Sequence, residues 1–102
     1  MFVAMNRFKV TPGREGDFEE QWRGRESYLG EVPGFLHFAL LRSDNAGDYV
    51  SHTTWKDRQA FMDWTASEAF AKSHRQGSVA GLLQGPPEIS LYDAVLEQAP
   101  QG

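Results

Sequence analysis

Two short segments of this chain are apolar on both faces when read as β-strands, and this feature restricts the fold more than any other. In residues 2–10, apolar side chains occupy both sets of alternating positions, with Phe2, Ala4, Phe8 and Val10 on one face and Val3 and Met5 on the other. Residues 35–41 form an almost continuous apolar run that only His37 interrupts. Because such strands need cover on both sides, the sheet that contains them must lie between two layers.

Turn signals divide the chain into alternating strands and helices. We expect strands over residues 2–10, 35–41, 49–55 and about 88–96, and amphipathic helices over residues 17–29 and 57–77. The order β-α-β-β-α-β within about 100 residues predicts an α+β, ferredoxin-like fold. Such a fold has one antiparallel sheet with both helices on one face.

Local signals place the helix ends. Asp57 is a typical N-cap for the second helix. Thr65 followed by Glu68 has the pattern of a capping box, which predicts that this helix breaks and restarts there before ending at Gly77. The stretch 78–87 is expected to be a looser loop beside the end of that helix.

Two helices cover only one face of the predicted sheet. The second face of the apolar strands then has to meet a partner, so we expect a homodimer that packs sheet against sheet.

Composition and charge exclude several classes. A chain of 102 residues predicts one domain over residues 1–97, followed by a flexible tail over 98–102. A net charge of −4 without a basic run argues against a nucleic-acid partner. No apolar stretch is long enough to cross a membrane or to resemble a signal peptide, so a cytoplasmic protein is expected. The absence of cysteine excludes disulfides and thiolate metal sites, and no zinc or non-haem iron spacing occurs.

Three polar residues interrupt the apolar pattern. Asn6 shares the face of Phe2 and Phe8, Arg25 lies on the apolar stripe of the first helix, and His74 follows Phe70 by one helical turn. All three are expected to point between sheet and helices, into an aromatic-lined binding cleft. Each also has a purely structural interpretation.

Those structural interpretations differ from residue to residue. Asn6 could satisfy a backbone group at a strand bulge. His74 could interact with a helix dipole, and Arg25 could lay its stem along apolar surface. Trp64, at helical spacing from Phe61, could be an ordinary core residue.

The stretch from Trp55 to Trp64, followed by Phe70-Ala71-Lys72-Ser73-His74, resembles the IsdG-type haem-degrading monooxygenases of the antibiotic biosynthesis monooxygenase (ABM) superfamily. The segments 5–7 and 32–35 fit the same family, so the likeness covers roughly residues 1–95. Its most specific part is the combination of Asn6 with Trp64 and His74.

The resemblance implies a role for each residue of this set. His74 would be the axial ligand of haem iron, Asn6 would donate a hydrogen bond on the distal side, and Trp64 would press against a ruffled porphyrin. Contact with the haem is implied for a wider set: Asn6, Trp22, Arg25, Trp64, Phe70 and His74. Arg25 would contact a propionate, whereas Gln21 stands where some relatives carry a basic residue. The loop 78–87 would act as a mobile cover.

The implied reaction is opening of the porphyrin ring with release of iron, in which haem is both cofactor and substrate. It requires O2 and an external reductase or small reductant, because the chain has no flavin or nicotinamide motif. The family is dimeric, as the two-faced strands require independently. Three alternatives remain open: a cofactor-independent oxygenase for quinols or polyketide-like phenols, a haem-binding dimer without turnover, and a structural dimerisation module.

Overall fold

The computed structural model describes residues 1–24, 29–68, 70–71 and 81–100. The elements follow one another as β1 (Phe2–Lys9), α1 (Glu15–Arg23), the 3₁₀ turn η1 (Leu29–Glu31), β2 (Phe35–Arg42), β3 (Asp48–Trp55), α2 (Arg58–Thr65) and β4 (Glu88–Asp93). The predicted order β-α-β-β-α-β is confirmed.

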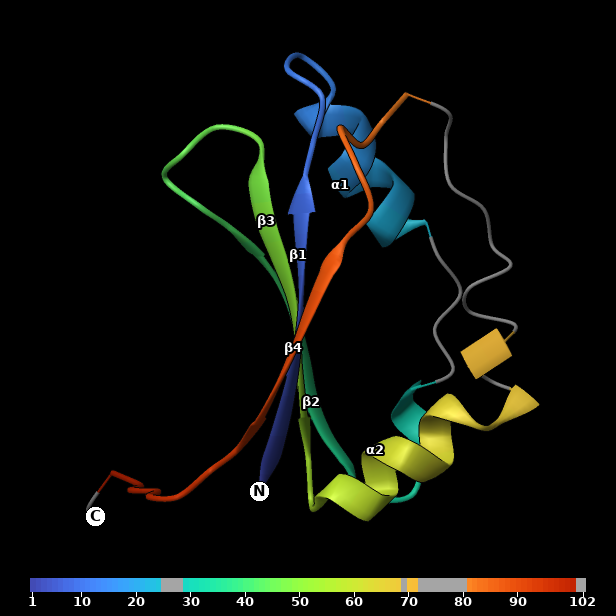
Figure 1. Cartoon of the computed structure of the whole chain (residues 1–102), viewed down its shortest axis with the longest axis vertical. Helices are drawn as coiled ribbons and strands as arrows, with labels where there is room; N and C mark the ends of the chain where they lie inside the picture. Colours follow the sequence, from blue (N-terminus) through green and yellow to red (C-terminus); the bar gives the residue numbers. More distant parts are fainter. Residues whose placement is uncertain (25–28, 69, 72–80, 101–102) are drawn as a thin grey trace.

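The four strands form one antiparallel sheet in the order β2-β3-β1-β4. Along β1, Phe2, Ala4 and Phe8 are buried and Val3 and Met5 are half-buried, which confirms the predicted faces. Figure 1 shows α1 and α2 on the same side of the sheet, at opposite ends of it. The ferredoxin-like fold class is therefore confirmed.

The predicted ends of the first helix and of the last strand, and the predicted cap at the helix break, are wrong. The first helix ends at Arg23 with Gly24 as its C-cap, and Leu29 lies in η1 rather than in a continuing helix. The last strand stops at Asp93, three residues earlier than expected. The second helix breaks after Thr65 as predicted, but Ser67 caps the restart: its Oγ accepts from Phe70 N at 3.2 Å, while Thr65 Oγ1 donates to Met62 O.

Asp57 does cap α2, since its carboxylate accepts a hydrogen bond from Ala60 N at 2.9 Å. Gly77, the predicted end of the restarted helix, lies outside the described residues.

The described part of the loop 78–87 is fastened to the end of β1, contrary to the expected mobile cover. Leu82 is buried, and its carbonyl accepts a hydrogen bond from Thr11 N at 2.9 Å. Gln84 N donates to Lys9 O at 2.8 Å. Residues 81–84 therefore belong to the packed body of the domain.

No helix of the described chain covers the sheet face opposite α1 and α2 (Figure 1), and this face carries a mixture of apolar and polar side chains. Half-buried or exposed apolar side chains on this face are Val3, Met5, Ala39, Leu41, Val50 and Tyr92. Beyond β4, Val95 and Leu96 are 97% and 87% exposed.

Gly34 fixes the distance between the start of β2 and α2. Its φ is +81°, and a Cβ at this position would lie 2.5 Å from Ala60 Cβ. We expect Gly34→Ala to lower the free energy of unfolding by about 2–3 kcal/mol, from the left-handed backbone and the overpacking together. Urea denaturation measures this cost.

Gly16→Ala is the matched control, because Gly16 lies inside α1 with no atom within 4 Å of the added Cβ. It should be neutral or stabilising by up to about 1 kcal/mol. Equal losses in the two variants would contradict the close contact between Gly34 and α2.

Candidate functional site

The core on the helix side of the sheet consists of two separate clusters. The cluster under α1 combines Phe18 of the helix with the buried residues Phe8, Val10, Tyr49 and Leu82. The cluster under α2 combines Phe61 of the helix with Phe2, Ala4 and Trp55. The two helices occupy opposite ends of the sheet (Figure 1), so the middle of this face falls between the clusters.

Asn6 lies in this gap between the two clusters, the interruption of the core. Along β1 it is preceded by Ala4 of one cluster and followed by Phe8 of the other, on the same face. The pairing of β1 with β3 and β4 runs without a register shift through Asn6, so the bulge interpretation is wrong. Within the described chain its amide forms no side-chain hydrogen bond, which leaves the amide available to a ligand.

Trp64 and Phe70 are brought together by the break in the second helix. Their rings meet edge to face with centroids 4.8 Å apart, and Trp64 also packs on Trp55 at 5.3 Å. Trp64 is half-buried, and its indole Nε1 is shielded without a hydrogen-bond partner among the described residues. Trp64 therefore packs against the cluster under α2 while staying half-buried, and its indole Nε1 has no hydrogen-bond partner in the described chain.

Trp22 lies on the other side of the interruption, on α1. It stacks on Phe38 with centroids 5.6 Å apart and contacts Phe8 edge-on at 5.9 Å. These contacts hold a half-buried indole over β1 and β2.

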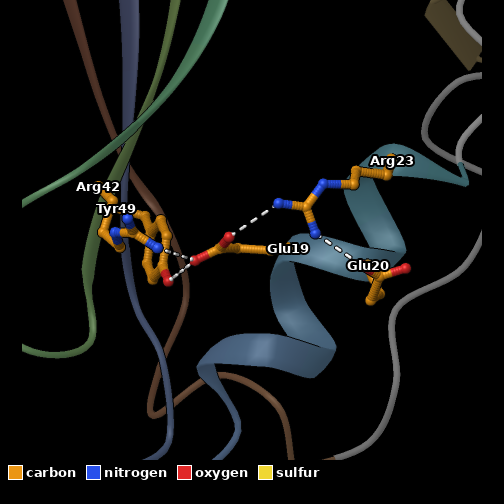
Figure 2. Close-up of polar contacts among 5 residues, drawn as sticks. All are labelled: Glu19, Glu20, Arg23, Arg42 and Tyr49. Atoms are coloured by element: carbon orange, nitrogen blue, oxygen red, sulfur yellow. Dashed lines mark hydrogen bonds and ion pairs between the residues drawn. The ribbon is translucent and has the colours of Figure 1, made fainter.

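Glu19 fastens α1 to the sheet one turn before Trp22. Its carboxylate accepts hydrogen bonds from Tyr49 Oη at 2.5 Å and from Arg42 Nη1 at 3.1 Å, and it also pairs with Arg23 (Figure 2). The hydrogen bond from Tyr49, with help from Arg42, lowers the pKa of Glu19 below its ordinary value. Burial and this same bond raise the pKa of Tyr49.

We expect Glu19→Gln to lower the melting temperature at pH 7, because the ionised carboxylate is the form that these donors stabilise. A depressed pKa in the folded state contributes stability above the unfolded value of about 4.3, and this contribution disappears as the pH falls through the folded pKa. The difference from the parent should thus shrink in melts recorded towards pH 3.

Glu20→Gln serves as the control, since among the described residues the Glu20 carboxylate pairs with Arg23, and its side chain is 73% exposed. A pH-independent loss in Glu19→Gln, or an equal loss in Glu20→Gln, would contradict the anchoring role.

The described residues line two open pockets, one beside each helix. The first, of about 580 Å³, includes Trp22, Leu40 and Tyr49 in its lining; the second, of about 360 Å³, includes Val32, Ala60 and Trp64. Neither is lined by Asn6. The described residues thus place the predicted aromatic side chains on both sides of Asn6 without joining them in one cavity.

Arg25 and His74, two members of the predicted site, lie outside the described residues. The propionate contact and the iron ligand expected of them therefore stay predictions.

Ser51 is a second polar residue on the helix-facing side of the sheet, and the sequence pattern did not indicate it. It is 6% exposed and pairs directly with Asn6 in the β1–β3 register. The alternation along residues 49–55 could have indicated the face on which Ser51 lies. Its pairing with Asn6, however, follows only from the register between β1 and β3.

Two further kinds of feature are absent from the described chain. No three His, Asp or Glu side chains there are close enough to hold a metal ion. No helix there is long and apolar enough to cross a membrane.

Comparison with known proteins identifies the family. The family model described as "Antibiotic biosynthesis monooxygenase" matches residues 1–76. Heme oxygenase (staphylobilin-producing) 1 of Staphylococcus aureus strain Newman is 30% identical over 76 residues, which cover 72% of this chain and 71% of that protein.

Two solved structures share the fold over nearly the whole chain. The heme-degrader MhuD from Mycobacterium tuberculosis, with two hemes bound in its active site, superposes with a TM-score of 0.79 at 26% identity, covering 97% of this chain and 100% of MhuD. A mutant of SnoaB, a cofactor-independent oxygenase from Streptomyces nogalater, superposes with a TM-score of 0.72 at 26% identity, covering 98% of this chain and 97% of SnoaB. The chain belongs to the antibiotic biosynthesis monooxygenase family, a family of oxidoreductases.

Proposed function

We propose that this protein is a haem-degrading monooxygenase, which opens the porphyrin ring with O2 and external electrons and releases iron. The observation that carries the proposal is the free amide of Asn6 on the helix-facing side of the sheet, at the interruption between the two core clusters. The similarity to a haem oxygenase and to a haem-bound degrader supports the same choice.

The described residues fit a flat, largely apolar ring. Half-buried indoles of Trp22 and Trp64 lie on either side of Asn6, and the buried Nε1 of Trp64 is a hydrogen-bond donor without a partner in the described chain. Haem, once bound, would supply the iron that activates O2.

The chain's own residues would then have separate tasks. Asn6 would donate a hydrogen bond on the distal side of the haem, and Trp64 would press against the porphyrin ring. His74 would hold the iron as its axial ligand, and Arg25 would pair with a propionate, with Trp22 and Phe70 lining the apolar walls. The electrons would come from a separate reductase or a small reductant.

We further propose that the protein acts as a homodimer. The apolar side chains on the uncovered face of the sheet, together with the exposed Val95 and Leu96, support association between copies. Light scattering should give about 23 kDa, twice the chain mass of 11.5 kDa. A mass of one chain at micromolar concentration would contradict the dimer.

Hemin titration tests the proposed reaction. The expected result is a saturable Soret shift, followed by bleaching and release of chelatable iron when ascorbate is added in air. A shift without bleaching would favour a haem-binding protein without turnover. No shift would overturn the proposal.

One observation favours a second candidate, a cofactor-independent oxygenase acting on a quinol or a polyketide-like phenol. The sequence identity to SnoaB equals that to MhuD, at 26%, although the TM-score is 0.72 for SnoaB and 0.79 for MhuD. Oxygen uptake with a phenolic substrate and no added haem would support this function and should be measured beside the hemin titration.

A further inference from the structure

We infer that Ser51 is a second hydrogen-bond donor beside Asn6, and that the pair binds one small acceptor ligand on the distal side of the haem. The inference rests on the proposed haem function and adds a residue to that site.

The register places the two side chains together. Asn6 and Ser51 are direct partners in the antiparallel β1–β3 pair, so their side chains leave the same face of the sheet. The Cβ atoms of such partners lie about 4.5–5.5 Å apart. An amide and a hydroxyl at this separation can both reach a single acceptor atom above the sheet.

The surroundings of the pair are apolar. Ser51 pairs with Leu40 on its other side, and along β3 the buried ring of Tyr49 precedes it on the same face. Ser51 is itself 6% exposed. A hydroxyl in such a place normally has a partner.

Within the described chain, Ser51 forms no side-chain hydrogen bond, as is also true of Asn6. Thr53, the next residue of β3 on this face, differs: its Oγ1 donates to Ala4 O at 3.3 Å. The sheet thus satisfies one hydroxyl internally and leaves the one beside Asn6 available.

The two free groups coincide with the interruption between the core clusters. Tyr49 belongs to the cluster under α1 and Trp55 to the cluster under α2, so Ser51 interrupts β3 where Asn6 interrupts β1. A ligand atom here would meet two donors, and its surroundings would otherwise be apolar.

Azide is the probe, because it coordinates ferric haem and accepts hydrogen bonds from distal donors. In the hemin complex of the full chain, Ser51→Ala should raise the Kd for azide about three- to tenfold, the effect of one lost hydrogen bond. Hemin affinity itself should stay within about twofold of the parent.

Two matched variants separate the hydroxyl from packing. Ser51→Thr keeps the hydroxyl and should restore most of the azide affinity. Thr53→Val removes the hydroxyl that already donates to Ala4 and should leave the azide Kd unchanged. In the ferrous CO complex, the C–O stretching frequency should differ from the parent's in Ser51→Ala but not in Thr53→Val.

The outcomes distinguish this inference from the proposed function. If the parent binds hemin and Ser51→Ala binds azide as tightly as the parent, Ser51 is not a distal donor and the haem function stands. Equal losses in Ser51→Ala and Thr53→Val would assign the effect to packing and overturn the inference. A parent that gives no Soret shift would overturn both.

Discussion

A His74→Ala variant is expected to bind hemin at least about 100-fold more weakly than the parent and to lose ring opening. Removing an outer-shell partner of a metal-binding histidine already costs about 10- to 100-fold in affinity, so removing the ligand itself should cost more. Optical titration with hemin measures this loss. The Soret band of any residual complex should also differ from that of a histidine-ligated haem.

Asn6→Ala should separate binding from turnover. It removes a distal donor and keeps His74 as the iron ligand, so hemin affinity should be retained. Ring opening should slow about 10- to 100-fold, as expected for one hydrogen bond to a charged acceptor. Asp44→Ala is a control, because Asp44 is exposed in the turn between β2 and β3. Equal hemin affinity in His74→Ala and the parent would exclude the axial role.

Phe18→Ala is expected to lower the free energy of unfolding by about 3–5 kcal/mol. Phe18 is 2% exposed and is the buried residue of α1, with its ring 4.8 Å from Tyr49 and 5.3 Å from Phe8. Its removal leaves a cavity between α1 and the sheet. Urea denaturation followed by tryptophan fluorescence measures the loss.

The same variant should also weaken hemin binding, because Trp22 lies one turn further along α1 and depends on the same anchor. Met62→Ala on α2 is the control; Met62 is 49% exposed, and its loss should change stability by no more than about 0.5 kcal/mol. A Phe18→Ala variant as stable as Met62→Ala would mean that α1 does not depend on this contact.

Period-two alternation along β1 correctly predicted the face on which Asn6 lies, and the turn signals correctly predicted the order of strands and helices. These features follow from local geometry, which a sequence contains directly. The end of α1 was missed because Leu29 continues the helical periodicity past Gly24, whereas the chain leaves the helix at that glycine.

The remaining differences have two causes, which are competition between similar local signals and pairing between distant strands. Thr65 and Ser67 are both capping residues, and only the backbone at the break decides that Ser67 is used. Ser51 could not be paired with Asn6 from the sequence, because this requires the register in which β3 pairs with β1. Long-range pairing of this kind depends on the whole sheet and not on a window of sequence.

The interruption between the two core clusters also affects how the domain responds to heat. Each helix is held mainly by its own cluster, so the two ends of the molecule can loosen separately and local opening at one end need not disrupt the other. A porphyrin ring bound over Asn6 would contact both ends of the domain, so that the two ends would unfold together. Ligand binding would then raise the cooperativity of unfolding as well as its midpoint.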